Sequence, residues 1–190
     1  MKALLIDTTG SKLLIAVDFE GKVFSHVSEV GKKGHSAVLM PAIDRLLCDN
    51  GVKIDDIDTI CAVVGPGSFT GIRIGVATAT ALAFSLNAKR ISVTSFELLA
   101  YSGVSATLAV DAGHGNLYVA KSKDGEIVST DFIDGEEAKK VDRSKFVFET
   151  ENPVDALVGV ARKKAEKGEY VAVFEPYYMR KSQAEREKGL

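Results

Sequence analysis

Few residues in this sequence have the type and spacing that catalysis or metal binding requires. The three histidines, His26, His35 and His114, are scattered and no two stand four residues apart. Cys48 and Cys61 lack metal-ligand spacing and lie in apolar stretches, which predicts two reduced thiols in the core. No nucleophile and base stand at a helpful spacing either. The residues alone therefore predict neither a catalytic group nor a metal centre.

The most distinctive stretch is glycine-rich: residues 65–75 read Gly-Pro-Gly-Ser-Phe-Thr-Gly-Ile-Arg-Ile-Gly. It predicts a tight turn after a buried strand, followed by a helix that Ser68 or Thr70 caps. Arg73 falls in the first turn of this helix, where it either faces water or meets an acid or a phosphate group. The helix runs on to Leu86 and is built mostly from small residues, so another surface can approach it closely.

Composition is typical of a soluble globular protein. The chain has 190 residues, 46% of them hydrophobic and 26% charged, with a formal net charge of -2. This length suits one large domain or two small lobes, and the charge shows no basic excess for gripping nucleic acid alone. No apolar run approaches the roughly 18 residues of a membrane span, and the opening residues indicate a strand rather than a signal peptide. We therefore expect a cytoplasmic protein that contacts no membrane.

The elements that position the glycine-rich segment begin with three antiparallel strands, expected over residues 2–7, 12–18 and 23–30. A helix is expected over about 35–50, where apolar residues recur at helical spacing. A strand over 59–64 then enters the glycine-rich segment. The remaining expected elements are a strand over 90–93, a short helix over 96–101, a strand over 146–148 and a helix over 153–167.

The second half of the chain repeats the opening of the first half. The two copies align without a gap at an offset of 104 residues, and both read as strand, Asp-containing turn, strand, glycine turn, strand. The identities in this frame are Asp7 with Asp111, Leu13 with Leu117, Ala16 with Ala120, Gly21 with Gly125 and Ser25 with Ser129. Alternation common to all hairpins is the simpler explanation, but identities in register favour duplication. The second copy then degenerates through a charged stretch, and a charged tail that we expect to fray follows Arg180.

Two lobes, 1–102 and a smaller 103–190, each opening with such a meander, resemble the actin-like ATPase superfamily. The resemblance implies an α/β, ribonuclease H-like fold in which each lobe has a mixed sheet flanked by helices. In that superfamily the two first turns hold phosphate and metal, which implies a vestigial nucleotide site. Its residues would be Asp7, Thr8, Thr9 and Asp111. Aspartate is also a favoured turn residue whose side chain bonds its own backbone, and this alternative stays open.

Residues 65–75 resemble the hallmark of the bacterial TsaB (YeaZ) family, the non-catalytic paralogues of TsaD. Further agreement lies in Ile6-Asp7-Thr8-Thr9, His35-Ser36 with Leu39-Met40-Pro41, Val110-Asp111-Ala112 with Leu117-Tyr118, and Pro176, Tyr178 and Arg180. Two features depart from the family: Gly113 and His114 stand where many members have an Arg-containing turn, and the second lobe is short.

TsaD resembles this chain through the glycine-rich turn, but it then carries paired histidines that hold a catalytic metal. The equivalent stretch here places Ser95 and Leu99 at the ligand positions. Leucine has no lone pair to offer a metal, so that centre cannot form. This comparison predicts a pseudo-enzyme and argues against a metallopeptidase, the least favoured reading.

The resemblance implies a scaffold that activates TsaD while TsaD transfers the threonylcarbamoyl group to the adenosine next to the anticodon of ANN-decoding tRNAs. The expected partner surface is formed by the helices over 35–50 and 72–86, at His35, Leu39, Ile43, Arg73, Val76, Ala79, Thr80 and Ala83. TsaE is the third member expected to join, tRNA is met only through the complex, and a homodimer forms when TsaD is absent. ATP or ADP and a metal are expected on TsaD, with no cofactor on this chain.

A small ATP-dependent phosphotransferase of the actin-like class is the alternative. In that case Asp7 or Asp111 would serve on the metal and the hairpin turns on phosphate. Such turns usually bring several glycines and polar residues in both lobes, and Thr8-Thr9 alone is thin support. Binding of Mg-ATP by the isolated chain would favour this alternative.

Overall fold

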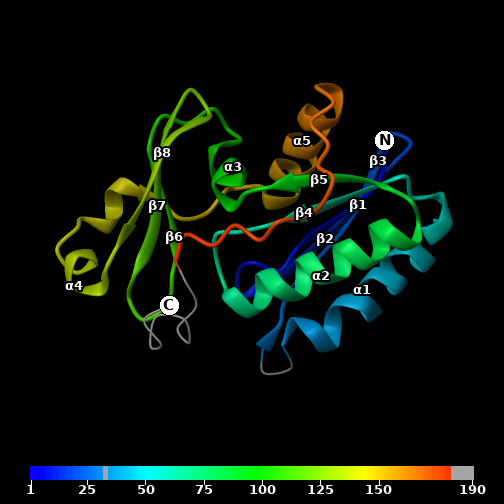
Figure 1. The fold of residues 1–190 in the computed structure, drawn as a ribbon, viewed down its shortest axis with the longest axis horizontal. Helices are drawn as coiled ribbons and strands as arrows, with labels where there is room; N and C mark the ends of the chain where they lie inside the picture. The colour runs from blue at the N-terminus through cyan, green and yellow to red at the C-terminus, as the bar shows by residue number, and fades with distance from the viewer. Residues whose placement is uncertain (32–33, 181–190) are drawn as a thin grey trace.

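The computed structural model describes residues 1–31 and 34–180, which form two β-sheets with helices around them (Figure 1). The charged tail expected to fray after Arg180 lies outside the described residues. The first sheet holds five strands in the order β3-β2-β1-β4-β5, and the second holds four in the order β8-β7-β6-β9. The fold is α/β, with two mixed sheets flanked by helices, as the sequence predicts.

The first sheet begins with an antiparallel meander and ends with parallel strands. Its members are β1 (Lys2–Asp7), β2 (Lys12–Phe19), β3 (Lys22–Glu29), β4 (Thr59–Val63) and β5 (Lys89–Val93). β1 pairs antiparallel with β2, so that Leu4 lies opposite Val17, and parallel with β4, so that Leu4 also lies opposite Ile60. β4 is buried at every residue because helices cover both faces of the sheet at its centre.

Alternate residues of β1 point into two separate cores. Leu4 and Ile6 face the core under α1 (His35–Asp49) and α2 (Phe69–Ser85), whereas Ala3 and Leu5 face the core under α5 (Pro153–Glu166). The period of two in a strand produces this division. Because both faces are buried, β1 and β4 read as nearly continuous apolar runs rather than alternating ones.

The second sheet repeats the β3-β2-β1-β4 order of the first, without a counterpart of β5 among the described residues. Its strands are β6 (Thr107–Asp111), β7 (Leu117–Lys123), β8 (Glu126–Ile133) and the two-residue β9 (Phe146–Val147), which pairs parallel with β6 as β4 does with β1. Short helices complete the chain at α3 (Ser95–Ala100), α4 (Gly135–Ala138), η2 (Ile54–Asp56) and η3 (Arg143–Lys145). The charged stretch that begins at Glu136 contains most of the short helix α4, whose N-cap is Asp134.

Helix α5 packs on the first sheet, although the sequence assigns residues 103–190 to the second lobe. A two-point ion pair fixes it there: Arg162 Nε and Nη2 donate to the two oxygens of buried Asp18 at 2.7 and 2.9 Å. The chain then returns along the first sheet, where Val171 N donates to Arg90 O at 2.9 Å. The predicted boundary between residues 102 and 103 therefore separates the strands of the two sheets. It does not separate the helices, because α5 follows the boundary and packs on the first sheet.

Of the two cysteines predicted in the core, only Cys61 is buried, and burial raises the pKa of its thiol. The expectation for Cys48 is wrong: its side chain is exposed, because it lies on α1 one position beyond the buried pair Leu46 and Leu47. Among the helices of residues 1–31 and 34–180, none has the length and apolar character that crossing a membrane requires.

Candidate functional site

The glycine-rich segment forms a turn at the end of β4 and then starts α2. Ser68 is the N-cap: its side-chain oxygen accepts a hydrogen bond from Gly71 N at 3.2 Å, and its own N–H donates to Thr9 O at 2.7 Å. Of the two capping residues that the sequence allows, Ser68 therefore serves, and Thr70 is exposed. The turn between β1 and β2 is joined directly to the start of α2.

The β1–β2 turn lies against two glycines of α2. Thr8 is fully buried, and its Oγ1 donates to Gly71 O at 2.7 Å. A Cβ atom on Gly71 would collide with Thr8 O, and one on Gly75 would collide with Thr8 Oγ1. The close approach that the small residues predict is real on this side of the helix. The surface that approaches, however, is the chain's own turn.

Asp7 organises this turn through its side chain. Its Oδ1 accepts hydrogen bonds from Thr9 N at 2.8 Å and from Thr9 Oγ1 at 2.7 Å. Burial raises the pKa of the Asp7 carboxyl, while the bonds from Thr9 and the nearby His35 lower it by less. The aspartate thus bonds its own backbone two residues on, as turn aspartates do.

Asp111 ends β6 in the second sheet, at the place that Asp7 has in the first. It is exposed, and its Oδ1 accepts a hydrogen bond from Gly113 N at 2.8 Å. The polar atoms of Thr8 and Thr9, in contrast, are committed to bonds within the first lobe. The vestigial nucleotide site expected at Asp7, Thr8, Thr9 and Asp111 stays a prediction, and each contact named here is structural.

Ser95 and Leu99, the positions at which the resemblance to TsaD implies metal ligands, both take part in the packing of this chain. Ser95 Oγ donates to Pro66 O at 2.7 Å, and Leu99 belongs to the core formed with Phe96 and Leu108. Within residues 1–31 and 34–180, no group of three or more His, Cys, Asp or Glu side chains is placed to hold a metal ion.

Five of the eight residues expected at a partner surface are core residues, and for them that expectation is wrong. Helical spacing places their side chains on the sheet side of α1 and α2, with exposed fractions of 9% or less. They are Leu39, Ile43, Val76, Ala79 and Ala83. Thr80 and Arg73 are exposed. His35 is half-buried, with Nε2 3.3 Å from Lys12 O.

Arg73 faces neither bulk water alone nor an acid. Its guanidinium lies over the ring of Phe69, 4.0 Å from the centroid, and its Nε donates to the hydroxyl of Tyr178 at 3.1 Å. The rings of Phe69 and Tyr178 are 5.0 Å apart between centroids. Arg73 therefore ties the start of α2 to the C-terminal segment, and stacking on an aromatic face is typical of arginine.

The outward side of α2 is a stripe of small residues that ends at a large one. Ala77, Thr80 and Ala81 are exposed, and Phe84 is 82% exposed, the largest fraction among the large hydrophobic side chains that the structure describes. On the neighbouring helix α1, Met40 is 48% exposed. Helical spacing could have predicted this stripe. If Val76, Ala79 and Ala83 face the core, Phe84 must face outward. We call Ala77, Thr80, Ala81 and Phe84 the outer stripe.

Comparison with known proteins identifies relatives of this arrangement. The family model described as TsaD, tRNA N6-adenosine threonylcarbamoyltransferase, matches residues 22–177. The chain is 42% identical over 103 residues to the tRNA threonylcarbamoyladenosine biosynthesis protein TsaB of Bacillus subtilis, a match that covers 54% of this chain and 45% of the relative. It is 30% identical over 155 residues to the Escherichia coli protein of the same name, covering 78% and 65%.

Among solved structures, YeaZ from Pseudomonas aeruginosa has the same fold. The TM-score is 0.77 at 23% sequence identity, and the match covers 93% of this chain and 99% of that one. The curated relatives are longer: this chain spans about half to two thirds of the length of the two TsaB proteins that it matches.

Proposed function

This chain belongs to the family described as tRNA N6-adenosine threonylcarbamoyltransferase, in its TsaB (YeaZ) group, and on that premise we propose that it is a non-catalytic, activating partner of TsaD. In this role it holds TsaD in a productive shape while TsaD transfers the threonylcarbamoyl group to the adenosine of tRNA. The chain itself contributes surface rather than chemistry.

The outer stripe is the observation that carries this proposal. Phe84 leaves 82% of its surface in water, next to a helix side whose other members are alanine and threonine. Soluble monomers rarely leave such apolar surface bare, and a large side chain beside small ones suits a close helix–helix contact. The stripe replaces the buried positions that sequence spacing alone suggested for the contact.

The pseudo-enzyme part of the proposal is supported at Ser95 and Leu99. The Ser95 hydroxyl donates its hydrogen bond to Pro66 O, and the Leu99 side chain has no lone pair with which to bind a metal. ATP or ADP and a metal are accordingly proposed to lie on TsaD. TsaE joins the same assembly in the cytoplasm, tRNA is bound through the complex, and a second copy of this chain covers the outer stripe when TsaD is absent.

Reconstituted tRNA modification tests the proposal. TsaD, TsaE, ATP, the AMP-linked threonylcarbamoyl donor and unmodified tRNA are incubated with and without this chain, and threonylcarbamoyl-adenosine is measured by mass spectrometry. We expect product to depend on the chain. Equal product without it would overturn the proposal.

A charged variant locates the surface. Phe84→Asp is expected to abolish the activation, because it buries a carboxylate against the partner. Val173→Asp is the matched control, since Val173 is also an exposed apolar residue, at 59%, but lies outside the outer stripe. Equal activation by both variants would contradict the assignment of the stripe.

A further inference from the structure

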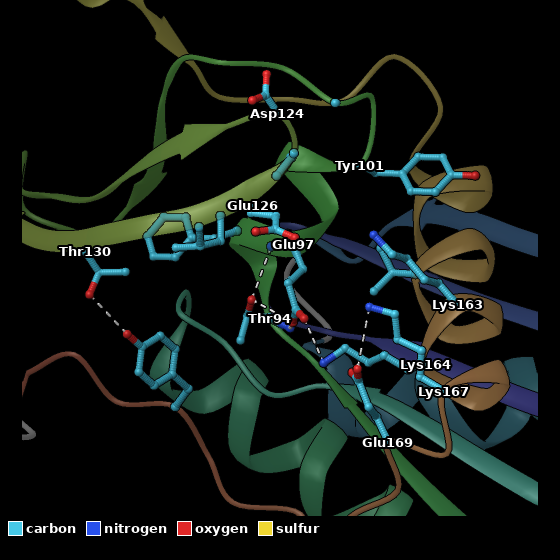
Figure 2. A pocket seen from close by; sticks show the side chains of 17 residues that line it. Thr94, Glu97, Tyr101, Asp124, Glu126, Thr130, Lys163, Lys164, Lys167 and Glu169 are labelled. Carbon is cyan, nitrogen blue, oxygen red and sulfur yellow. Dashed lines mark hydrogen bonds and ion pairs between the residues drawn. The ribbon is translucent and has the colours of Figure 1, made fainter.

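A cleft of about 660 Å³ opens where the two lobes meet, and none of the residues that line it belongs to the outer stripe. Three elements form it: α3, the start of β8, and the last turns of α5 (Figure 2). A cleft of this volume at the meeting of two lobes is of the size and position that small-molecule sites have. Its polar groups decide which molecule suits it.

The α5 wall presents three lysines, Lys163, Lys164 and Lys167 (Figure 2). The Lys164 ammonium is held in place: it lies 2.7 Å from Glu97 Oε1 and donates to Ser92 O at 2.9 Å. An ammonium group has three donors, so one N–H of Lys164 is left for a ligand in the cleft. The side chain is only 20% exposed, which strengthens a charge-assisted bond made there.

The acidic groups near these lysines are largely neutralised. Glu97 Oε2 accepts from Thr94 N at 2.6 Å and from Thr94 Oγ1 at 2.9 Å, and Oε1 pairs with Lys164. Glu169 lies 3.8 Å from Lys167. Among the described residues, Lys163 has no carboxylate within ion-pair distance, so the α5 wall keeps cationic character.

The opposite wall carries the opposite charge. Glu126 begins β8 and faces the cleft across from α5 (Figure 2), with no ion-pair partner among residues 1–31 and 34–180. Asp124, on the same wall, accepts a hydrogen bond from Ser105 Oγ at 3.3 Å. The cleft is also lined by Phe96, Ile127 and Val160; Ile127 is partly exposed, whereas Phe96 and Val160 are buried.

We infer that this cleft is a binding site for a small zwitterion with an apolar middle. The carboxylate of the ligand lies at Lys163 and Lys164, its ammonium lies at Glu126, and its hydrocarbon chain lies along Ile127. A plain anion meets Glu126 without compensation, and a plain amine meets the lysines, so both charges are needed. This inference concerns the isolated chain and does not depend on the proposed role with TsaD.

The test is a titration of the full-length, ¹⁵N-labelled chain with three probes that share one hydrocarbon chain. ε-Aminocaproate carries both charges, caproate only the carboxylate, and hexylamine only the ammonium. We expect ε-aminocaproate to shift the amide signals of α3, β8 and α5 with saturation in the millimolar range, and at least about tenfold tighter than either analogue. Absence of saturable shifts, or equal binding of caproate, would overturn the inference.

Variants assign the two ends of the ligand. Lys163→Met and Lys164→Met are each expected to weaken ε-aminocaproate at least about tenfold. Lys163 is the safer variant, because Lys164 also supports the cap of α3 through Glu97. Glu126→Gln is expected to weaken ε-aminocaproate and to strengthen caproate. Lys89→Met is the control and should leave binding unchanged, because Lys89 stacks on Tyr170 and does not line the cleft. Unchanged binding by Lys163→Met and Glu126→Gln would refute the site.

Discussion

The turn after β1 and the turn after β6 occupy equivalent places in two sheets that share the same order of four strands, yet only the first is packed. Thr8 and Thr9 are buried under the start of α2, whereas Asp111 is exposed at the end of its strand. Among residues 1–31 and 34–180, no helix covers the second sheet in the place of α2, because the chain leaves β9 for α5, which packs on the first sheet. The first turn supports the helix that carries the outer stripe. The second turn is bonded within itself and to the start of α4, where Asn116 Oδ1 accepts a hydrogen bond from Gly135 N at 2.9 Å.

Gly71 gives the largest expected difference between the two turns. Gly71→Ala places a Cβ atom against Thr8 O, and we expect a loss of about 3 kcal/mol in unfolding free energy, since backbone atoms must move. Gly113→Ala, in the second turn, meets open space and is strained only by its φ of +76°, for about 1 kcal/mol. Urea unfolding measures both. A larger loss at Gly113 would show that backbone conformation, not packing, separates the turns.

Thr8 gives the next effect. Its hydroxyl donates to Gly71 O, and its equivalent in the second turn is Ala112. Thr8→Ala is expected to lower the unfolding free energy by about 1–2 kcal/mol, because the buried Gly71 carbonyl loses its hydrogen bond from Thr8. The mirror change, Ala112→Thr, should stay within about 0.5 kcal/mol. Equal effects of the two changes in thermal unfolding would remove the distinction between a supporting and a free turn.

Replacement of Asp7 is expected to change the unfolding free energy least, and the change depends on pH. The raised pKa of Asp7 means that the folded chain favours the neutral carboxyl over the charged carboxylate. The stability that the neutral carboxyl contributes is therefore fully present below the unfolded pKa of about 3.9. It is lost as pH rises through the higher folded pKa. Asp7→Asn keeps the acceptor for Thr9 without the charge. It should match the natural chain in acid and exceed it near neutrality by less than about 1 kcal/mol. A variant that is less stable near neutrality would contradict this reading.

The sequence predicts much of this fold because its signals are local or repeated. The repeat at an offset of 104 residues predicts that both halves open with a three-strand meander, and both meanders are present. The glycine-rich segment predicts the turn and the helix that it forms. The helix face could not be chosen from residue size, since Ala79 and Ala83 are buried while Ala77 and Ala81, of the same type, are exposed. The place of α5 depends on a contact between Arg162 and Asp18, which lie 144 residues apart, and no local pattern encodes it.

Light scattering during size-exclusion chromatography of this chain mixed with TsaD tests the central claim most directly. The natural chain and Val173→Asp should elute with TsaD at the summed mass, and Phe84→Asp should elute apart from it. Separate elution of the natural chain and TsaD, or an unchanged complex with Phe84→Asp, would contradict the claim that the outer stripe is the working surface of this protein.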